Sequence, residues 1–236
     1  MKRFPAILAV AACAVLALAA PSARADALYG NLSVYVWNGV GVPDTASLST
    51  VPSGNPTATF NYSGPLNFVN NDSQAGGNTF AEFFNSNGTT NYTSDISSFS
   101  SSYTLSQFLN DLPMSTPGET GPNAVNTYMA FIGTYTAATD TSVTVSHDDG
   151  ASLYYISSAD AAFTSPDPTV DIPSTGILPA GTDVPFALVY VESNGAPSDL
   201  VVTGLTPTPE PSTIGFMALG MISLAAVAYR SGTLGS

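Results

Sequence analysis

The long middle of this chain has no permanent positive charge and no cysteine. The four basic residues of the 236-residue sequence stand at positions 2, 3, 24 and 230, and the single cysteine is Cys13. The span Asp26–Thr208 carries sixteen of the seventeen Asp and Glu residues, and its only possible cation is His147. Without Lys, Arg or a disulfide, this span can be held together only by apolar burial and by hydrogen bonds.

The same composition excludes several classes of function for this span. Nucleic acid is excluded as a partner because no side chain can neutralise its phosphates. Phosphoryl transfer and Schiff-base chemistry need Arg or Lys, and thiol catalysis needs cysteine. An acidic surface without cations fits instead a secreted protein that meets divalent cations such as calcium outside the cell.

The first 25 residues predict a secretory signal peptide, and therefore the Sec export machinery as a partner. Residues 2–3 form a basic start, residues 7–20 form an apolar core, and residues 23–25 offer small side chains for cleavage before Asp26. An alternative cut at Cys13, within the lipoprotein-like sequence Val-Ala-Ala-Cys, is disfavoured because it would leave apolar residues on the mature chain.

The other end of the chain has the layout of a processing tag. Residues 214–228 are uncharged and apolar, and with their flanks they predict a helix of about 17 residues, roughly 26 Å long, at the short end of what spans a bilayer. The preceding Pro-Thr-Pro-Glu-Pro is too rich in proline for a helix or a central strand, so it predicts an exposed, extended linker. One cation, Arg230, follows the apolar stretch.

An accessible peptide, an apolar anchor and a terminal cation together resemble the PEP-CTERM tail of bacterial exosortase substrates. The triplet that gives this family its name is Pro209, Glu210 and Pro211. The resemblance implies an exosortase as a partner, residues 205–212 as a linker and residues 213–236 as a transmembrane sorting segment that ends near Arg230. It also implies that the chain is anchored transiently in the membrane and then reaches the cell surface or the extracellular matrix.

The remaining body is long enough for one domain with a core, and we place this domain at residues 26–204. Segments rich in β-branched and aromatic residues, bounded by Gly, Pro, Asn or Asp, predict strands. They lie at residues 32–37, 57–62, 141–145, 152–156, 186–191 and 200–203. Trp37 alternates with Tyr35 along the first of them, so we expect it to be buried or half-buried. The spacing predicts a mostly β fold, an antiparallel β-sandwich or jelly roll.

Two further segments complete the expected architecture. Apolar residues at helical spacing, from Leu105 to Leu112, predict one short helix that ends before Pro113. Residues 86–106 contain 12 Ser or Thr among 21 positions, which predicts a flexible polar loop.

The sequence Asp148-Asp149-Gly150 is the strongest candidate for a ligand-binding site in the body of the chain. In a regular strand the two Asp side chains would point to opposite faces, so binding one ion together requires a bend or an unusual peptide geometry. Calcium suits such a pair, since it takes about 6–8 oxygen ligands in irregular geometry. The alternative is a turn capped by the two carboxylates, with a positive φ at Gly150.

A strand, Asp-Asp-Gly, and a later strand that ends in Asn-Gly resemble the PA14 domain over roughly residues 127–204. In calcium-dependent, sugar-binding members of that family the paired Asp hold calcium and a later Asn completes the site. The resemblance therefore implies Asp148, Asp149 and Asn194 as metal ligands, calcium as a possible cofactor and an extracellular polysaccharide as a possible partner.

Enzyme chemistry has little support in the sequence. His147 is the only histidine, no Gly-x-Ser-x-Gly is present, and we expect this histidine to be a solvated loop residue. A glycosidase-type carboxylate pair would draw on Glu82, Glu119 and Glu192, none of which lies in a motif. We therefore predict a non-catalytic protein of the cell surface or exopolysaccharide matrix, with no catalytic residues. A secreted glycan-active hydrolase is the alternative.

Overall fold

The structure, a computed structural model, describes residues 26–40, 46–70, 79–84, 92–115, 126–155, 160–165, 171–193, 195 and 198–208. All of them except Thr208 belong to one compact unit, Ala25–Pro207. The predicted signal peptide, and the predicted tail from Pro209 onward, lie outside the described residues.

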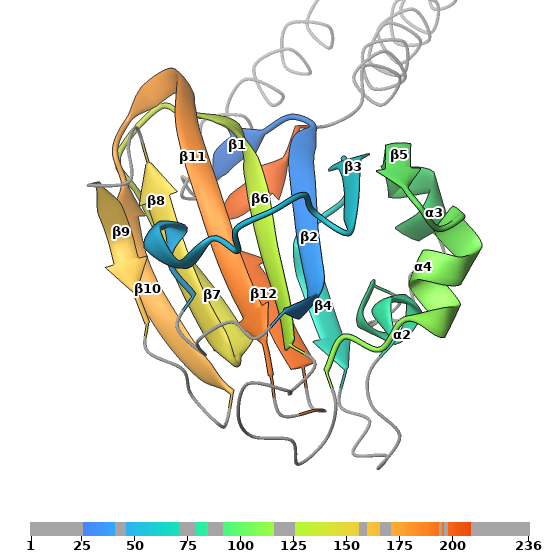
Figure 1. The fold of residues 1–236 in the computed structure, drawn as a ribbon. Helices are drawn as coiled ribbons and strands as arrows, with labels where there is room; N and C mark the ends of the chain where they lie inside the picture. The colour runs from blue at the N-terminus through green and yellow to red at the C-terminus, as the bar shows by residue number, and fades with distance from the viewer. Residues whose placement is uncertain are drawn as a thin grey trace, which may run out of the picture. The chain divides into compact units, whose positions relative to one another are not determined.

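Two sheets, almost entirely antiparallel, make up this unit (Figure 1). The larger has the strand order β5-β3-β2-β6-β11-β8-β9; in addition, β1 pairs with β6, and β13 pairs with β1. Its strands are β1 (Ala27–Tyr29), β2 (Leu32–Val40), β3 (Ala58–Tyr62), β5 (Ile96–Ser101), β6 (Asn126–Ala137), β8 (Gly150–Tyr155), β9 (Ala161–Thr164), β11 (Gly181–Glu192) and β13 (Leu205–Pro207). The smaller has the order β10-β7-β12-β4. Its strands are β4 (Asn67–Asn70), β7 (Thr141–Asp148), β10 (Ile172–Leu178) and β12 (Ser198–Thr203).

Apolar side chains from both sheets form one core between them. The smaller sheet contributes Phe68, Val145 and Leu200, and the larger contributes Phe131 and Leu153, all of them buried. The rings of Phe68 and Phe131 stack across the two sheets with their centroids 6.2 Å apart. Alternation of inward apolar and outward polar residues along each strand therefore produces a sandwich. The predicted mostly β, antiparallel sandwich is confirmed.

Short helices close one side of this core. They are α2 (Phe80–Phe84), α3 (Tyr92–Asp95) and α4 (Leu105–Asp111); a separate short 3-10 helix, η1 (Leu48–Thr50), has no buried residue. The predicted helix is α4, and Thr104 begins it with a capping box that includes Gln107. Phe108 of α4 stacks on Phe80 of α2 at 4.3 Å, so the helices seal the core with aromatic rings. No helix in the part of the chain that the structure describes is long and apolar enough to cross a membrane.

The strand predictions agree with the structure, but the predicted polar loop does not. All six predicted segments form strands, and several run longer than expected. Residues 86–91 lie outside the described residues, but within residues 92–106 the structure has α3, β5 and the start of α4 in place of the expected flexible loop. β5 pairs with β3 through backbone groups, and only Ile96 of this strand is buried, so serine is tolerated at its exposed positions. A serine-rich composition therefore hid an edge strand.

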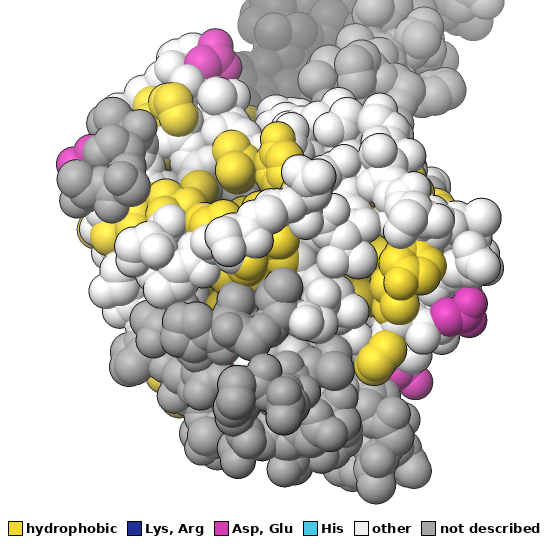
Figure 2. Space-filling model, in the orientation of Figure 1, with side chains coloured by type: hydrophobic (Ala, Val, Ile, Leu, Met, Phe, Trp, Pro, Cys, Tyr) yellow, Lys and Arg dark blue, Asp and Glu magenta, His cyan; other side chains and the backbone are white. Residues whose placement is uncertain are grey.

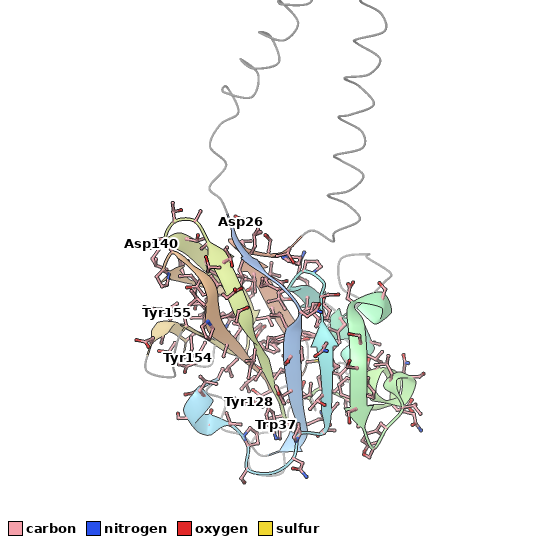
Figure 3. All side chains as sticks on the ribbon, turned by 90° about the horizontal axis from the view of Figure 1, so that it is seen from above. Asp26, Trp37, Tyr128, Asp140, Tyr154 and Tyr155 are labelled. Carbon is pink, nitrogen blue, oxygen red and sulfur yellow. The ribbon has the colours of Figure 1, made fainter. Side chains whose placement is uncertain are left out.

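A strap of residues 46–57 crosses the outer face of the larger sheet (Figure 1). Outward-pointing side chains hold it through hydrogen bonds to its carbonyl groups: Ser152 to Ala46 at 2.5 Å, Tyr128 to Ser47 at 2.7 Å and Trp37 to Gly54 at 3.2 Å. Trp37 and Tyr128 are labelled in Figure 3, and Figure 2 shows apolar side chains on both sides of the strap. Trp37 is only 9% exposed, which confirms its predicted burial.

The first and last described strands lie side by side. β1 and β13 pair in parallel, and the backbone N–H of Ala27 also donates to the carbonyl of Gly204 at 3.0 Å. Leu205 is buried in the core. The predicted linker 205–212 therefore begins later than expected, after Pro207, because its first three residues complete the larger sheet.

Candidate functional site

The Asp-Asp pair lies where the chain passes from one sheet to the other. Asp148 is the last residue of β7 in the smaller sheet, and Gly150 is the first residue of β8 in the larger. The peptide bond between Asp148 and Asp149 is cis. The side chains of Asp148 and Asp149 also lie within hydrogen-bond reach of each other. The structure therefore brings together the two Asp residues predicted to share a ligand.

The alternative turn geometry is not found. Positive φ angles occur at several described glycines, but Gly150 is not one of them. It is instead the buried first residue of the strand β8, where it pairs with Val191 of β11. The capped-turn interpretation is therefore wrong in its requirement for a left-handed glycine.

Hydrogen bonds fix Asp149 from two directions. Its Oδ2 accepts from the backbone N–H of Ser193 at 2.7 Å and from the Ser193 hydroxyl at 3.0 Å. Its carbonyl lies 2.5 Å from Nδ1 of His147, and Nε2 of the same ring lies 2.9 Å from the Ser174 hydroxyl. Because a carbonyl can only accept, Nδ1 carries the proton and Ser174 donates to Nε2.

His147 itself contradicts the prediction of a solvated loop residue. It continues the inward-facing series of Val143 and Val145 along β7, and it is fully buried. Burial lowers its pKa by disfavouring the charged ring, and this effect outweighs the hydrogen bond to Asp149. A neutral His147 therefore supports the Asp148–Asp149 segment through its hydrogen bond to the Asp149 carbonyl.

A buried acid lies directly behind the pair. Glu192, the last residue of β11, has no exposed surface. Its Oε1 accepts from the hydroxyl of Ser115 at 3.0 Å, and its Oε2 lies 2.7 Å from the hydroxyl of Tyr190. Tyr190 also donates to the backbone carbonyl of Asp148.

The contacts of the Tyr190 hydroxyl and the burial of Glu192 both bear on the charge of this carboxyl group. The Tyr190 hydroxyl has one proton, and if the carbonyl of Asp148 receives it, the contact with Glu192 needs a proton from the carboxyl group. Desolvation raises the pKa of Glu192 well above its usual range, and the negative charge of Asp149 raises it further. Burial and the nearby carboxylates therefore favour the neutral form of Glu192 in the folded chain.

Two more aspartates flank Asp148 on the smaller sheet. Asp199 of β12 stands directly opposite Asp148 in the antiparallel ladder. Asp171 precedes Ile172, which pairs with His147, so it lies on the other side of Asp148, and it accepts from the Ser146 hydroxyl at 2.6 Å. Burial, followed by repulsion from Asp199 and Asp171, raises the pKa of Asp148 to about 6. Burial and Asp171 also raise the pKa of Asp199.

One carboxylate oxygen of Asp199 is buried without a hydrogen-bond partner among the described residues. The residue is 7% exposed, and the backbone N–H of Asn70 hydrogen bonds to its carboxylate. Its Oδ1 is buried and has no hydrogen-bond partner among the described residues. Such a buried acceptor normally has a partner, an ordered water or an ion.

The donor set around Asp148 fits a hard cation. It consists of carboxylate, hydroxyl and carbonyl oxygens, the ligands that calcium prefers, and zinc would want imidazole or thiolate instead. Within the described ranges, no three His, Cys, Asp or Glu side chains are grouped to hold one ion. The third predicted ligand, Asn194, lies outside the described residues, as do the sorting residues Pro209, Glu210, Pro211 and Arg230.

The sequence interpretation missed Glu192, Tyr190 and Asp199 as parts of this site. Tyr190 and Glu192 share the inward face of β11 with Leu188, so the period of two along the strand was a usable signal for Glu192. Asp199 gave no such signal, because its neighbour Asp148 comes from a strand fifty residues earlier in the sequence.

The carboxylates considered for glycoside hydrolysis have other roles. Glu82 is exposed and caps α2, where it accepts from the backbone N–H of Thr79 at 2.7 Å and from the Thr79 hydroxyl at 2.9 Å. Glu192 is enclosed in the core, and Glu119 lies outside the described residues. Glu82 and Glu192 therefore do not form an exposed catalytic pair.

Comparison with solved structures finds distant relatives in shape. The chain is similar to a PA14 sugar-binding domain from an RTX adhesin, with a TM-score of 0.47 and 11% identity over 73% of this chain and 88% of that one. It is similar to the PA14 domain of the MpAFP antifreeze protein, with a TM-score of 0.40 and 14% identity over 78% and 84%.

The chain is also similar to the A domain of a subtype-switched epithelial adhesin from Candida glabrata, solved in complex with β-lactose. The TM-score is 0.41 and the identity is 10%, over 76% of this chain and 84% of that one. All three TM-scores are below 0.5, so the likenesses carry no argument about function. The sequence matches no protein-family model, and no protein of curated function matches it.

Proposed function

We propose that this chain is an exported, non-catalytic protein of the cell surface or extracellular matrix that binds a glycan through calcium at Asp148 and Asp149. The observation that supports this most strongly is the carboxyl pair itself. Two consecutive Asp side chains lie within hydrogen-bond distance of each other and are buried, in a body whose sequence offers no Lys or Arg to neutralise them. Asn194 is the further ligand that the PA14 resemblance implies.

The chain's own residues would hold the ion in a defined orientation. Ser193 fixes the Asp149 carboxylate through two hydrogen bonds, and His147 supports the Asp149 carbonyl. Calcium bound there would supply open coordination positions, which the hydroxyls of an extracellular polysaccharide could fill. Orientation by buried partners is what a preorganised binding site requires.

Calcium should stabilise the chain measurably. At 100 times its Kd, a ligand that binds only the folded state adds about 2.7 kcal/mol, which corresponds to a rise in Tm of roughly 5–10 °C for a domain of this size. We expect that rise on adding calcium to the chelator-treated full chain in mild detergent, followed by circular dichroism. Asp149→Asn should clearly reduce the rise, since the amide keeps the bonds to Ser193 but loses the charge.

The exposed Asp111 at the end of α4 provides the matched control. Asp111→Asn removes one charge away from the pair and should keep the full calcium effect. An unchanged Tm in the unsubstituted chain would refute the calcium site. A glycan array probed with and without chelator then tests the glycan, and calcium-independent binding to every glycan would refute that part.

The proposal also includes the delivery of the chain. The signal peptide predicted at residues 1–25 and the PEP-CTERM-like tail support export by the Sec machinery, transient anchoring and processing by an exosortase. We expect replacement of Pro209, Glu210 and Pro211 by alanine to leave the tail uncut in cells that express an exosortase. Intact mass measurement of the surface fraction would show this, and a wild-type cleavage pattern in the triple variant would contradict it.

A further inference from the structure

We propose that Asp199 and Asp148 together bind a second calcium ion, on the outer face of the smaller sheet beside the Asp148–Asp149 pair. This inference rests on the proposed function, since both ions use Asp148, with one carboxylate oxygen facing each of them.

The strand register places the two carboxylates together. Asp199 and Asp148 are direct partners in the β12–β7 ladder, and residues that face each other in an antiparallel pair project to the same side with their Cβ atoms about 4.5–5.5 Å apart. This side is the outer face, because Leu200 and His147, the next pair along, point into the core. Like charges in such a pair destabilise the sheet unless something offsets them.

The unpartnered oxygen indicates what offsets the charge. Asp199 is 93% buried, because 7% of its surface is exposed, and its Oδ1 has no hydrogen-bond partner among the described residues. The nearest ionisable neighbours that act on it and on Asp148 are all acids, with Asp171 affecting both. A buried, unpaired acceptor opposite a second carboxylate is a ligand pair for a cation.

The cation has to come from solution. The span 26–208 contains no Lys or Arg, and the ring nitrogens of His147 already contact Asp149 and Ser174. All available protein ligands are oxygen atoms, which selects a hard ion, and calcium accepts an irregular, partly hydrated shell more readily than magnesium. In the proposed site two carboxylates hold the ion and water completes its coordination; among the described residues, no group of three His, Cys, Asp or Glu side chains is placed to hold one.

Binding stoichiometry tests the inference. We expect isothermal titration of calcium into the chelator-treated full chain, in mild detergent, to show two ions per chain. Asp199→Asn should reduce this to one ion, and Asp149→Asn should leave one as well. Asp183→Asn is the matched control, since Asp183 is exposed in β11 and its φ of 52° suits asparagine. It should keep two ions.

Stability gives a second readout. Without calcium, Asp199→Asn should raise the Tm by several degrees, because the amide removes the repulsion and can donate to Asp148; with calcium, its gain in Tm should be smaller than that of the unsubstituted chain. If the unsubstituted chain binds only one ion, and Asp199→Asn binds one ion with the same Kd, the second ion is overturned and the first is left intact. Complete loss of binding in Asp199→Asn would overturn it as well, in favour of a single shared site. No binding by any form would refute both sites.

Discussion

Without divalent cations, the folded chain should be more stable at pH 5.5 than at pH 8.5. The folded state raises the pKa of Asp148 from 3.8 to about 6, and it raises those of Glu192 and Asp199. An acid whose pKa is raised on folding adds stability that is complete below its unfolded pKa and is lost as the pH rises through its folded pKa. Each unit of pKa shift corresponds to about 1.4 kcal/mol.

His147 acts in the opposite direction over part of this range. Its pKa is lowered on folding, so its stabilising contribution is present above about pH 6.5 and is lost toward lower pH. It therefore cancels part of the gain from Asp148 below that pH. Above it, the acids whose pKa is raised act without this opposition, so the free energy of unfolding falls with increasing pH.

Urea unfolding of the full chain with chelator at several pH values measures this dependence. Calcium at pH 8.5 should recover part of the lost stability, because an ionised Asp148 becomes a ligand. Stability that stays level or rises between pH 5.5 and 8.5 would show that Glu192 and Asp148 are already ionised in the folded chain.

The predictable part of the fold was the part that alternates. Along β7, Val143 and Val145 are buried and Ser142 and Thr144 are partly exposed, which is the period of a half-buried strand. The same alternation extends to His147, yet a residue next to two aspartates was assigned to a solvated turn. Proximity to polar residues was a poorer guide to its burial than the phase of the strand.

The sequence did not predict the strand β5, for a different physical reason. Its exposed serines carry no hydrophobic signal, and its place at the edge of the larger sheet comes from backbone pairing with β3. Backbone hydrogen bonds do not depend on side-chain type, so a sequence pattern cannot reveal them.

The candidate site also has a part that could be predicted from the sequence and a part that could not. The adjacency of Asp148 and Asp149 is written in the sequence, and their predicted proximity only required an unusual peptide. Asp199 reaches the same place through the register of β12 against β7, and Glu192 reaches it through β11 and the Tyr190 hydroxyl. These relations are tertiary, because they depend on which strands pair and on their alignment.

Substitution of Glu192 should separate its charge from its hydrogen bonds. Glu192→Ala should cost about 3 kcal/mol, because it leaves a cavity in the core and removes the partners of the Tyr190 and Ser115 hydroxyls. Glu192→Gln keeps the shape of the side chain, with an N–H that can donate to Tyr190 and a carbonyl that can accept from Ser115. It should lie within about 1 kcal/mol of the unsubstituted chain at pH 5.5.

The informative comparison is at high pH. If Glu192 is a neutral acid in the fold, Glu192→Gln should exceed the stability of the unsubstituted chain at pH 8.5 and lose most of the pH dependence, since glutamine does not titrate. Glu82→Gln is the matched control, because Glu82 is exposed and its change should leave that pH dependence intact. A Glu192→Gln chain as unstable as Glu192→Ala at both pH values would mean that the folded state needs a charged carboxylate there. In that case Tyr190 must give its proton to Glu192, and the carbonyl of Asp148 would need another donor.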